Sequence, residues 1–218
     1  MSEAAWVAIG GSSGLAPRAV MPAIIRGTEL AVWRDPDGAV HAWRNQCPHR
    51  GMRLSFGFVD GDGRLACRYH GWRYGTDGKC AAIPAHPDRP PPDDVSATAY
   101  ASDERDGLIW VALSDAPSLG EIVLPGEELM FCRSLVARAD PDMIIDAAAA
   151  HEVAPGVVRA EGEGAVVVLA LQPIDPRRTG VHLLMVADDI DNTARRLEVA
   201  AWGRRLRQRI EARVDAGA

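Results

Sequence analysis

Cys47-Pro48-His49-Arg50-Gly51 and Cys67-Arg68-Tyr69-His70-Gly71-Trp72 are the two stretches of this 218-residue sequence that decide its fold. Each stretch offers one thiol and one imidazole, and seventeen residues separate His49 from Cys67. Cysteines placed this close to histidines are more often metal ligands than disulfide partners. The four side chains therefore predict a metal site, which could hold either a single zinc ion or an iron–sulfur cluster.

The composition of each half separates these two alternatives. Zinc fingers usually pair Cys with Cys and His with His, whereas each half here contributes one of each. The mixed pairing suits a [2Fe–2S] cluster in which one iron takes two thiolates and the other takes two imidazoles. Both stretches fall between predicted strands and run into a glycine, Gly51 or Gly71, where the backbone can turn tightly and point amides at sulfur. We therefore expect a cluster of the Rieske type, with structural zinc as the alternative.

The first half of the chain is predicted to be a small antiparallel β domain, residues 1–117. Short apolar or alternating runs are broken by turn residues, and no segment between them has the length of a helix. Asp37-Gly38 predicts a type I′ hairpin turn, and the five prolines of residues 84–94 predict a surface loop. The expected strands cover residues 6–9, 24–25, 29–33, 40–43, 64–68, 71–74 and 108–113.

The second half, residues 118–218, is predicted to mix helices and strands, which makes the whole chain α+β. Residues 143–153 could form a short helix, and residues 165–172 and 181–186 read as buried strands. Residues 193–214 have apolar positions at helical spacing, and Asn192 can cap that helix.

Charge and hydropathy limit the possible partners and location. The formal net charge of −6 argues against nucleic acid, because phosphate binding needs a cationic surface. No basic stretch followed by an apolar one opens the sequence, and the longest strictly apolar run is the seven residues 165–171. We therefore expect a cytoplasmic protein without a membrane partner. Cys80 and Cys132 have no histidine beside them and are expected to be small semi-buried thiols.

The first half of the chain also resembles a known protein family. Residues 5–115 resemble the Rieske domain of aromatic-ring-hydroxylating and O-demethylating oxygenases, and the extra cysteine pair of respiratory-chain Rieske proteins is missing. The resemblance implies a [2Fe–2S] cofactor ligated by Cys47, His49, Cys67 and His70, with the histidines near the surface. Backbone amides of residues 50–52 and 72–73 could tune the cluster, and Trp72 and Tyr69 either tune it or simply pack. The matching segments are residues 47–51, 67–72, 74–80, 83–84 and 104–111.

The same resemblance implies a helix-grip-like second domain. Departures from the family pattern in this domain predict that it holds no iron. Family members hold a mononuclear iron there through two histidines and a carboxylate, and a bridging aspartate precedes the first histidine. Aligned on His151, the bridging position is Ala148 and the second histidine position is Gly156. Arg209 falls where the carboxylate is expected, with Glu211 close by. We therefore expect no mononuclear iron on this chain; a lone His151 assisted by Asp146 or Glu152 is the alternative.

These features favour a non-catalytic subunit of an oxygenase complex. The chain would pass electrons from a reductase or ferredoxin to the mononuclear iron of a partner catalytic subunit, in a hetero-oligomer for which the resemblance implies trimeric symmetry. The alternatives are a stand-alone Rieske ferredoxin, an oxygenase with an atypical metal site, and a cluster-bearing sensor or structural subunit. The last helix could contribute to the interface or be a solvated basic helix. Its arginines are residues 195, 196, 204, 205, 207, 209 and 213.

Overall fold

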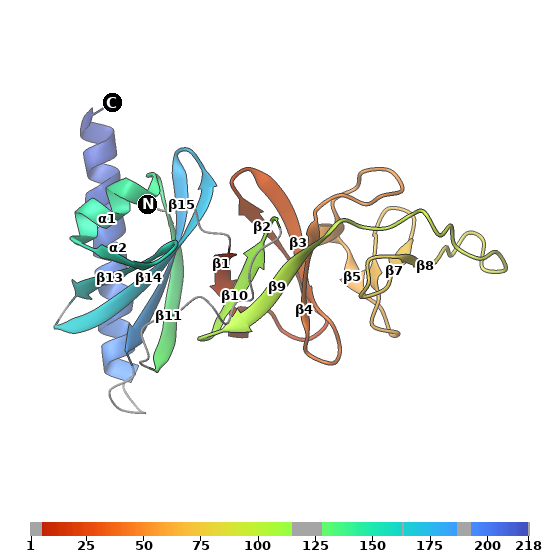
Figure 1. Cartoon of the computed structure of the whole chain (residues 1–218), viewed down its shortest axis with the longest axis horizontal. Helices are drawn as coiled ribbons and strands as arrows, with labels where there is room; N and C mark the ends of the chain where they lie inside the picture. Colours follow the sequence, from red (N-terminus) through yellow and green to blue (C-terminus); the bar gives the residue numbers. More distant parts are fainter. Residues whose placement is uncertain (1–5, 115–127, 163, 187–192, 218) are drawn as a thin grey trace. The chain divides into compact units, whose positions relative to one another are not determined.

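The computed structural model describes residues 6–114, 128–162, 164–186 and 193–217 and divides the chain into two compact units (Figure 1). One unit comprises residues 13–24 and 28–102, here called the cluster unit. The other comprises residues 1–12, 25–27 and 103–218, here called the C-terminal unit. Both units are built mainly from antiparallel strands and the second adds two α-helices, so the predicted α+β class is confirmed.

The cluster unit contains two layers of strands. Four strands follow one another across the first layer in the order β9-β4-β3-β2. The second layer has the order β5-β6-β7-β8 and is antiparallel throughout. The strands are β2 (Val20–Ile25), β3 (Thr28–Arg34), β4 (Val40–Arg44), β5 (Phe58–Val59), β6 (Leu65–Ala66), β7 (Arg73–Tyr74), β8 (Cys80–Ala82) and β9 (Ala99–Arg105), with short 3₁₀ turns η1 (Ser12–Gly14) and η2 (Leu54–Phe56).

The turn of the β3–β4 hairpin differs from the predicted type I′. The hairpin is present, but the Gly38 amide donates to the Asp35 carbonyl at 3.2 Å and only Gly38 has a positive φ, of 96°. Pro36 favours this arrangement, because its ring fixes φ near −65°, the value that the second residue of a type I turn adopts. A type I turn followed by a left-handed glycine forms instead.

The apolar core of the cluster unit is aromatic. Trp33 and Trp43 are buried with their rings edge to face at a centroid distance of 5.1 Å, and Trp43 meets Tyr74 in the same way at 6.5 Å. Cys47 and Cys67 belong to this same buried cluster. The two cysteines of the motif are therefore held by the core itself.

The C-terminal unit is a five-stranded antiparallel sheet covered on both faces. Its strand order is β11-β15-β14-β13-β12. Helices α1 and α2 lie on one face, as Figure 1 shows, and the antiparallel pair β1–β10 packs on the other. The elements are β1 (Trp6–Gly11), β10 (Leu108–Ala112), β11 (Leu129–Ala137), α1 (Pro141–Ala148), β12 (His151–Ala154), β13 (Val157–Gly162), β14 (Ala165–Asp175), β15 (Arg178–Val186) and α2 (Thr193–Gly217).

Residues 165–171 are apolar without interruption because both faces of strand β14 are covered. Successive side chains of a strand point to opposite faces. Val167 and Leu169 pack with the helices, while Val168 and Ala170 pack with Trp6 and the rest of the β1–β10 pair. The buried strands expected at residues 165–172 and 181–186 are confirmed, and so is the long last helix. Asn192, its predicted cap, lies outside the described residues.

The helix predicted over residues 143–153 is only partly correct. Helix α1 begins at Pro141 behind Asp140, whose carboxylate accepts from the Met143 amide, and it ends at Ala148. Ala149 adopts a left-handed conformation with a φ of 49°, and the chain turns into β12. Alanine is a strong helix former, but the pairing of β12 with β13 outweighs this local preference at the end of the alanine run.

The predicted boundary between residues 117 and 118 also lies outside the described residues. The division into compact units differs from the predicted domains, because β1, β10 and residues 25–27 are grouped with the C-terminal sheet. The inward side chains of β1 and β10, including Trp6, Leu108 and Trp110, share one apolar cluster with Val168 and Leu184. In the part of the chain that the structure describes, no helix is long and apolar enough to cross a membrane.

Gly162 tests the packing of α2 on the sheet. A Cβ at this position would lie 2.7 Å from the Trp202 ring, which is closer than carbon atoms can approach. We expect Gly162→Ala to lower the free energy of unfolding by about 1–3 kcal/mol and the melting temperature by several degrees. Gly61→Ala is the control for thermal unfolding, because nothing lies within 4 Å of its Cβ position. Equal melting temperatures for the two variants would contradict the packing described.

His182 makes the stability of the C-terminal unit depend on pH. Complete burial lowers the pKa of His182 from 6.5 to about 4, and its ring nitrogens meet Ser134 Oγ at 2.7 Å and Gln172 Oε1 at 3.1 Å. Below pH 6.5 the histidine binds a proton in the unfolded chain, whereas in the folded chain it stays neutral until the pH approaches 4. The free energy of unfolding therefore falls as the pH drops from 6.5 towards 4. The loss amounts to about 3 kcal/mol. Urea unfolding between pH 7 and 4 should show this dependence in wild type and in His86→Gln, a surface control, and lose it in His182→Gln.

Candidate metal centre

The two motif stretches fold into loops with the same backbone hydrogen bonds. The Cys47 amide donates to the Met52 carbonyl at 2.8 Å, and the Gly51 amide donates to the Cys47 carbonyl at 2.8 Å. In the second loop, Cys67 donates to Trp72 at 2.8 Å and Gly71 donates to Cys67 at 2.9 Å. Gly51 and Gly71 have φ values of 72° and 73°, a conformation that costs a side-chain-bearing residue energy. The glycines thus allow the tight turns that the sequence predicted.

The structure brings the four predicted ligands together, with the thiols inside and the imidazoles outside. Cys47 and Cys67 are each 2% exposed and lie within hydrogen-bonding reach of each other. His49 is half-buried and His70 is exposed, with 4.9 Å between their ring centroids. The ligands therefore pair by type across the loops, two sulfurs on one side and two ring systems on the other. A two-iron cluster with thiolates on one iron and imidazoles on the other needs this arrangement.

The charge on Cys67 is set by opposing effects. Burial raises the pKa of the Cys67 thiol, and contact with Cys47 raises it further. The backbone amides of Tyr69 and His70 donate to the sulfur and lower this pKa. These amides stabilise a thiolate in a site from which water is excluded. They differ from the amides expected at residues 50–52 and 72–73, because the loop turns its third and fourth residues towards the sulfur.

Tyr74 is a neighbour of the site that the sequence did not single out. Its hydroxyl lies 3.1 Å from Cys47 Sγ and its side chain is fully buried. Burial strongly raises the pKa of Tyr74, and the cysteines raise it further, so the phenol keeps its proton and can donate it to sulfur. Tyr74 occurs in the sequence motif two residues after Trp72, but only the course of β7 shows that it points at Cys47.

Two more aromatic rings contact the predicted histidine ligands. Trp72 stacks on His49 with ring centroids 4.2 Å apart and planes within 9°, and the Tyr69 ring lies 3.9 Å from that of His70. Tyr69 is 60% exposed, which rules out a role as a core residue. Trp72 and Tyr69 therefore restrict the orientation of the two imidazoles.

Comparison with known protein families identifies the kind of domain that contains this site. Residues 5–99 match the Rieske [2Fe–2S] domain. The chain carries a Rieske domain. That domain implies a [2Fe–2S] cluster, and the paired thiols and paired imidazoles fit it.

Sequence relatives of the chain include oxygenase components. It is 39% identical over 147 residues to the oxidoreductase NdmD and 40% identical over 110 residues to the methylxanthine N1-demethylase NdmA, both of Pseudomonas putida. It is 34% identical over 113 residues to the oxygenase subunit of 3-chlorobenzoate-3,4-dioxygenase from Comamonas testosteroni. The matches cover 64%, 50% and 49% of this chain but only 25%, 30% and 26% of these relatives. The predicted resemblance to Rieske-type oxygenase components is confirmed.

Solved structures extend the similarity of fold to the C-terminal unit. Apo dicamba monooxygenase superposes with a TM-score of 0.77 over 95% of this chain and 85% of its own, at 19% identity. NdmA superposes with a TM-score of 0.71 over 94% of this chain and 80% of its own, at 20% identity. At this level of identity the likeness concerns the fold alone.

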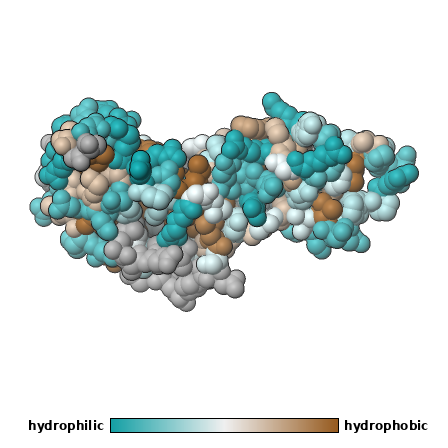
Figure 2. Space-filling view, turned by 90° about the horizontal axis from the view of Figure 1, so that it is seen from above, coloured by the Kyte–Doolittle hydropathy of each residue, from teal (hydrophilic) through white to brown (hydrophobic). Residues whose placement is uncertain are grey.

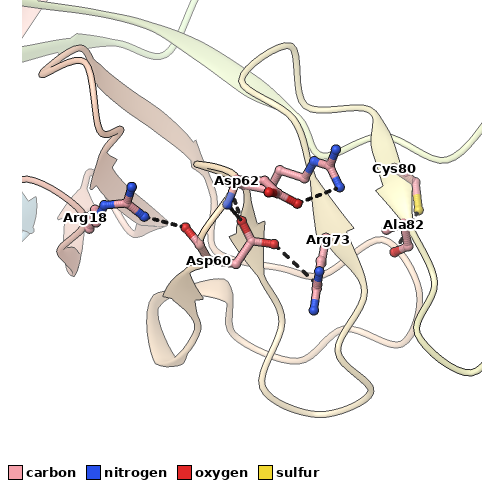
Figure 3. Close-up of polar contacts among 7 residues, drawn as sticks. Arg18, Asp60, Asp62, Arg73, Cys80 and Ala82 are labelled. Atoms are coloured by element: carbon pink, nitrogen blue, oxygen red, sulfur yellow. Dashed lines mark hydrogen bonds and ion pairs between the residues drawn. The ribbon is translucent and has the colours of Figure 1, made fainter.

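A buried aspartate holds the strand that positions two neighbours of the Rieske site. Asp60 Oδ1 accepts from the amides of Asp62 and Arg64, and Oδ2 lies 3.3 Å from Arg73 Nε (Figure 3). The Asp60 carbonyl accepts from Arg18 at 2.6 Å. Arg73 stands between Trp72 and Tyr74, so this ion pair fixes the start of β7. Figure 3 also shows Cys80, whose thiol faces the Ala82 carbonyl on β8.

In the C-terminal unit, the positions aligned with the family's iron ligands have structural roles. His151 begins strand β12 and is exposed, Ala148 ends α1, and Gly156 lies in the β12–β13 turn with a φ of 76°. Arg209 is exposed, and Glu211 Oε1 accepts from the Arg138 amide at 3.4 Å. Among residues 6–114, 128–162, 164–186 and 193–217, no three His, Cys, Asp or Glu side chains converge as the ligands of a single metal ion would. The four residues of the cluster loops instead form one pair of thiols and one pair of imidazoles, which a two-iron cluster requires.

The residues proposed to assist His151 are occupied elsewhere. Asp146 pairs with Arg213 at 3.2 Å, and Glu152 Oε1 accepts from the Gly156 amide at 3.3 Å. The remaining histidines include His41, which stacks on Trp33 and bonds to Asp35, and the buried His182. The expected lack of a mononuclear iron stays a prediction.

Tyr74→Phe tests the hydroxyl–sulfur contact. Donation to a ligand sulfur stabilises the more negative, reduced cluster, so its loss should lower the midpoint potential on the order of tens of millivolts. Redox titration of the purified protein measures this shift. Tyr100→Phe, a change on β9 in the same unit, is the control and should leave the potential unaltered. An unchanged potential in Tyr74→Phe would show that the contact does not reach the cluster.

Proposed function

We propose that this chain is the electron-transfer subunit of a non-haem iron oxygenase. Cys47 and Cys67 would bind one iron of the cluster, and His49 and His70 the other. The pairing of two buried thiols with two imidazoles nearer the surface carries this proposal. A cluster so ligated accepts and gives up one electron at a potential between about −150 and +300 mV.

The surroundings of the four ligands suit reversible electron transfer. Tyr74 and the amides of Tyr69 and His70 offer hydrogen bonds to sulfur without adding charge. The imidazoles are the exposed side of the site, so electrons would enter and leave there. Trp72 and Tyr69 would keep both rings in place as the charge of the site changes.

The acceptor in this proposal is the mononuclear iron of a partner catalytic subunit. Support comes from the C-terminal unit, which has the fold of dicamba monooxygenase while His151 is exposed on a strand and Arg209 takes the place expected for a carboxylate. The unit would then contribute contacts to the partner rather than catalysis. A reductase or ferredoxin would supply the electrons, and the complex would have trimeric symmetry. A cytoplasmic location stays a prediction.

Metal counting on a co-purified complex tests the division of labour. Co-expression with the product of an adjacent gene should give two irons per copy of this chain and a further iron on the partner. A third iron on this chain, or turnover by this chain with a reductase alone, would favour an oxygenase with an atypical site. A loaded chain that forms no complex and reduces an unrelated oxygenase would favour the stand-alone ferredoxin.

Substitution of predicted ligands gives a sharper test. Cys67→Ser and His70→Ala each remove one ligand, and we expect both to abolish turnover by the complex while the partner keeps its iron. Cys132→Ser is the matched control, because Cys132 is a thiol that packs against the apolar core of the C-terminal unit. Iron content and electron paramagnetic resonance of the reduced complex identify which iron is lost. Turnover that survives in His70→Ala would contradict the ligand assignment.

A further inference from the structure

The exposed aromatic side chains of this protein are concentrated beside the cluster loops. The chain has only three phenylalanines and three tyrosines. Phe56, Phe58 and Tyr69 are 53%, 47% and 60% exposed. Half of all these residues are therefore at the surface, within fourteen positions of one another. Aromatic side chains are enriched at protein interfaces, where they add large contact areas.

The chain path places the two phenylalanines against the second cluster loop. Phe58 on β5 lies opposite Ala66 on the neighbouring strand β6, and Ala66 directly precedes Cys67. The next residue of β5, Val59, points to the opposite face of the strand and is buried. A Cβ on Gly57 would lie 2.4 Å from the Ala66 carbonyl, so the backbones meet closely there. Phe56 and Phe58 thus adjoin the loop that carries Tyr69 and His70. Figure 2 shows small hydrophobic areas among hydrophilic ones on the surface of this unit.

The same stretch is cationic in an acidic protein. Residues 44–73 contain six arginines and two aspartates, a net charge of +4, whereas the whole chain carries −6. Three of these arginines are paired with carboxylates, as in Arg53 with Glu29 at 2.7 Å. Arg44, Arg50 and Arg68 are exposed, and within the described part of the chain none of them has a carboxylate in ion-pair contact. Arg50 follows His49 directly, and Arg68 follows Cys67.

We infer that this face docks an acidic one-electron donor protein. The docking surface consists of Arg50, Arg68, Tyr69, Phe56 and Phe58, and the inference rests on the proposed function. Opposite charges steer two proteins together and raise the rate of encounter, while the aromatic rings supply the desolvated contact. The acidic remainder of the chain repels the same donor, so the cationic face selects a docked orientation with the histidines at the contact.

Reduction of the loaded cluster by a plant-type [2Fe–2S] ferredoxin of net negative charge tests this inference. Stopped-flow absorbance gives the second-order rate constant. In wild type the rate constant should fall steeply as ionic strength is raised from about 0.05 to 0.5 M, because salt screens exposed charges. In the double variant Arg50→Glu, Arg68→Glu it should fall about tenfold or more at low salt. Phe56→Ser, Phe58→Ser should weaken docking while leaving the salt dependence in place.

Arg204→Glu is the matched control, since Arg204 is an exposed arginine on α2. Its rate constant should stay within about twofold of the wild-type value. Iron content and the resonance spectrum of the reduced cluster establish that each variant is loaded. A wild-type rate constant that is independent of salt, or charge reversals that change it no more than Arg204→Glu does, would overturn the docking surface. Failure of the wild-type chain to bind a cluster at all would instead refute the proposed function.

Discussion

Burial of Cys47 and Cys67 side by side is the constraint on which the rest of the cluster unit depends. Two sulfurs that must carry negative charge are held in an aromatic core, where an uncompensated charge is costly. Backbone amides of the loop, the Tyr74 hydroxyl and the predicted iron atoms together offset that cost. The loops must therefore close tightly around the sulfurs, which the left-handed glycines Gly51 and Gly71 allow.

The surface side of the site follows from the same geometry. Because the sulfurs face the core, the imidazoles on the same short loops face outward, and Trp72 and Tyr69 restrict their rings. The ion pair of Asp60 with Arg73 anchors β7, in which Tyr74 contacts Cys47, while Trp72 just before the strand stacks on His49. Electrons would then pass through two imidazole rings whose orientation is held by these contacts. The cationic and aromatic residues around those rings make this end of the unit suited to contact with another protein.

The stability of the C-terminal unit does not depend on a metal site. Its sheet is covered by helices on one face and by β1–β10 on the other, so its core has the strand alternation and packing of a complete domain. The positions that the sequence analysis aligned with iron-site residues of the family are a strand start, a helix end, a turn glycine and an exposed arginine. Stability of the sheet does not require ligands, because apolar burial on both faces supplies it. The predicted absence of a mononuclear iron is therefore compatible with an intact fold.

The sequence by itself determined the cluster type, its four predicted ligands, the strand-rich first half and the long last helix. These depend on local features: the spacing of Cys and His, glycines at turns, and apolar periodicity. Tertiary structure alone decided that Tyr74 faces Cys47, that His151 lies on a strand, and that β1 and β10 pack on a face of the C-terminal sheet. Each of these outcomes depends on contacts between residues far apart in the chain, such as Trp6 with Val168, which no local pattern records. The turn at Asp35–Gly38 shows the opposite case, since Pro36, a local feature of the sequence, favours the turn that the structure shows.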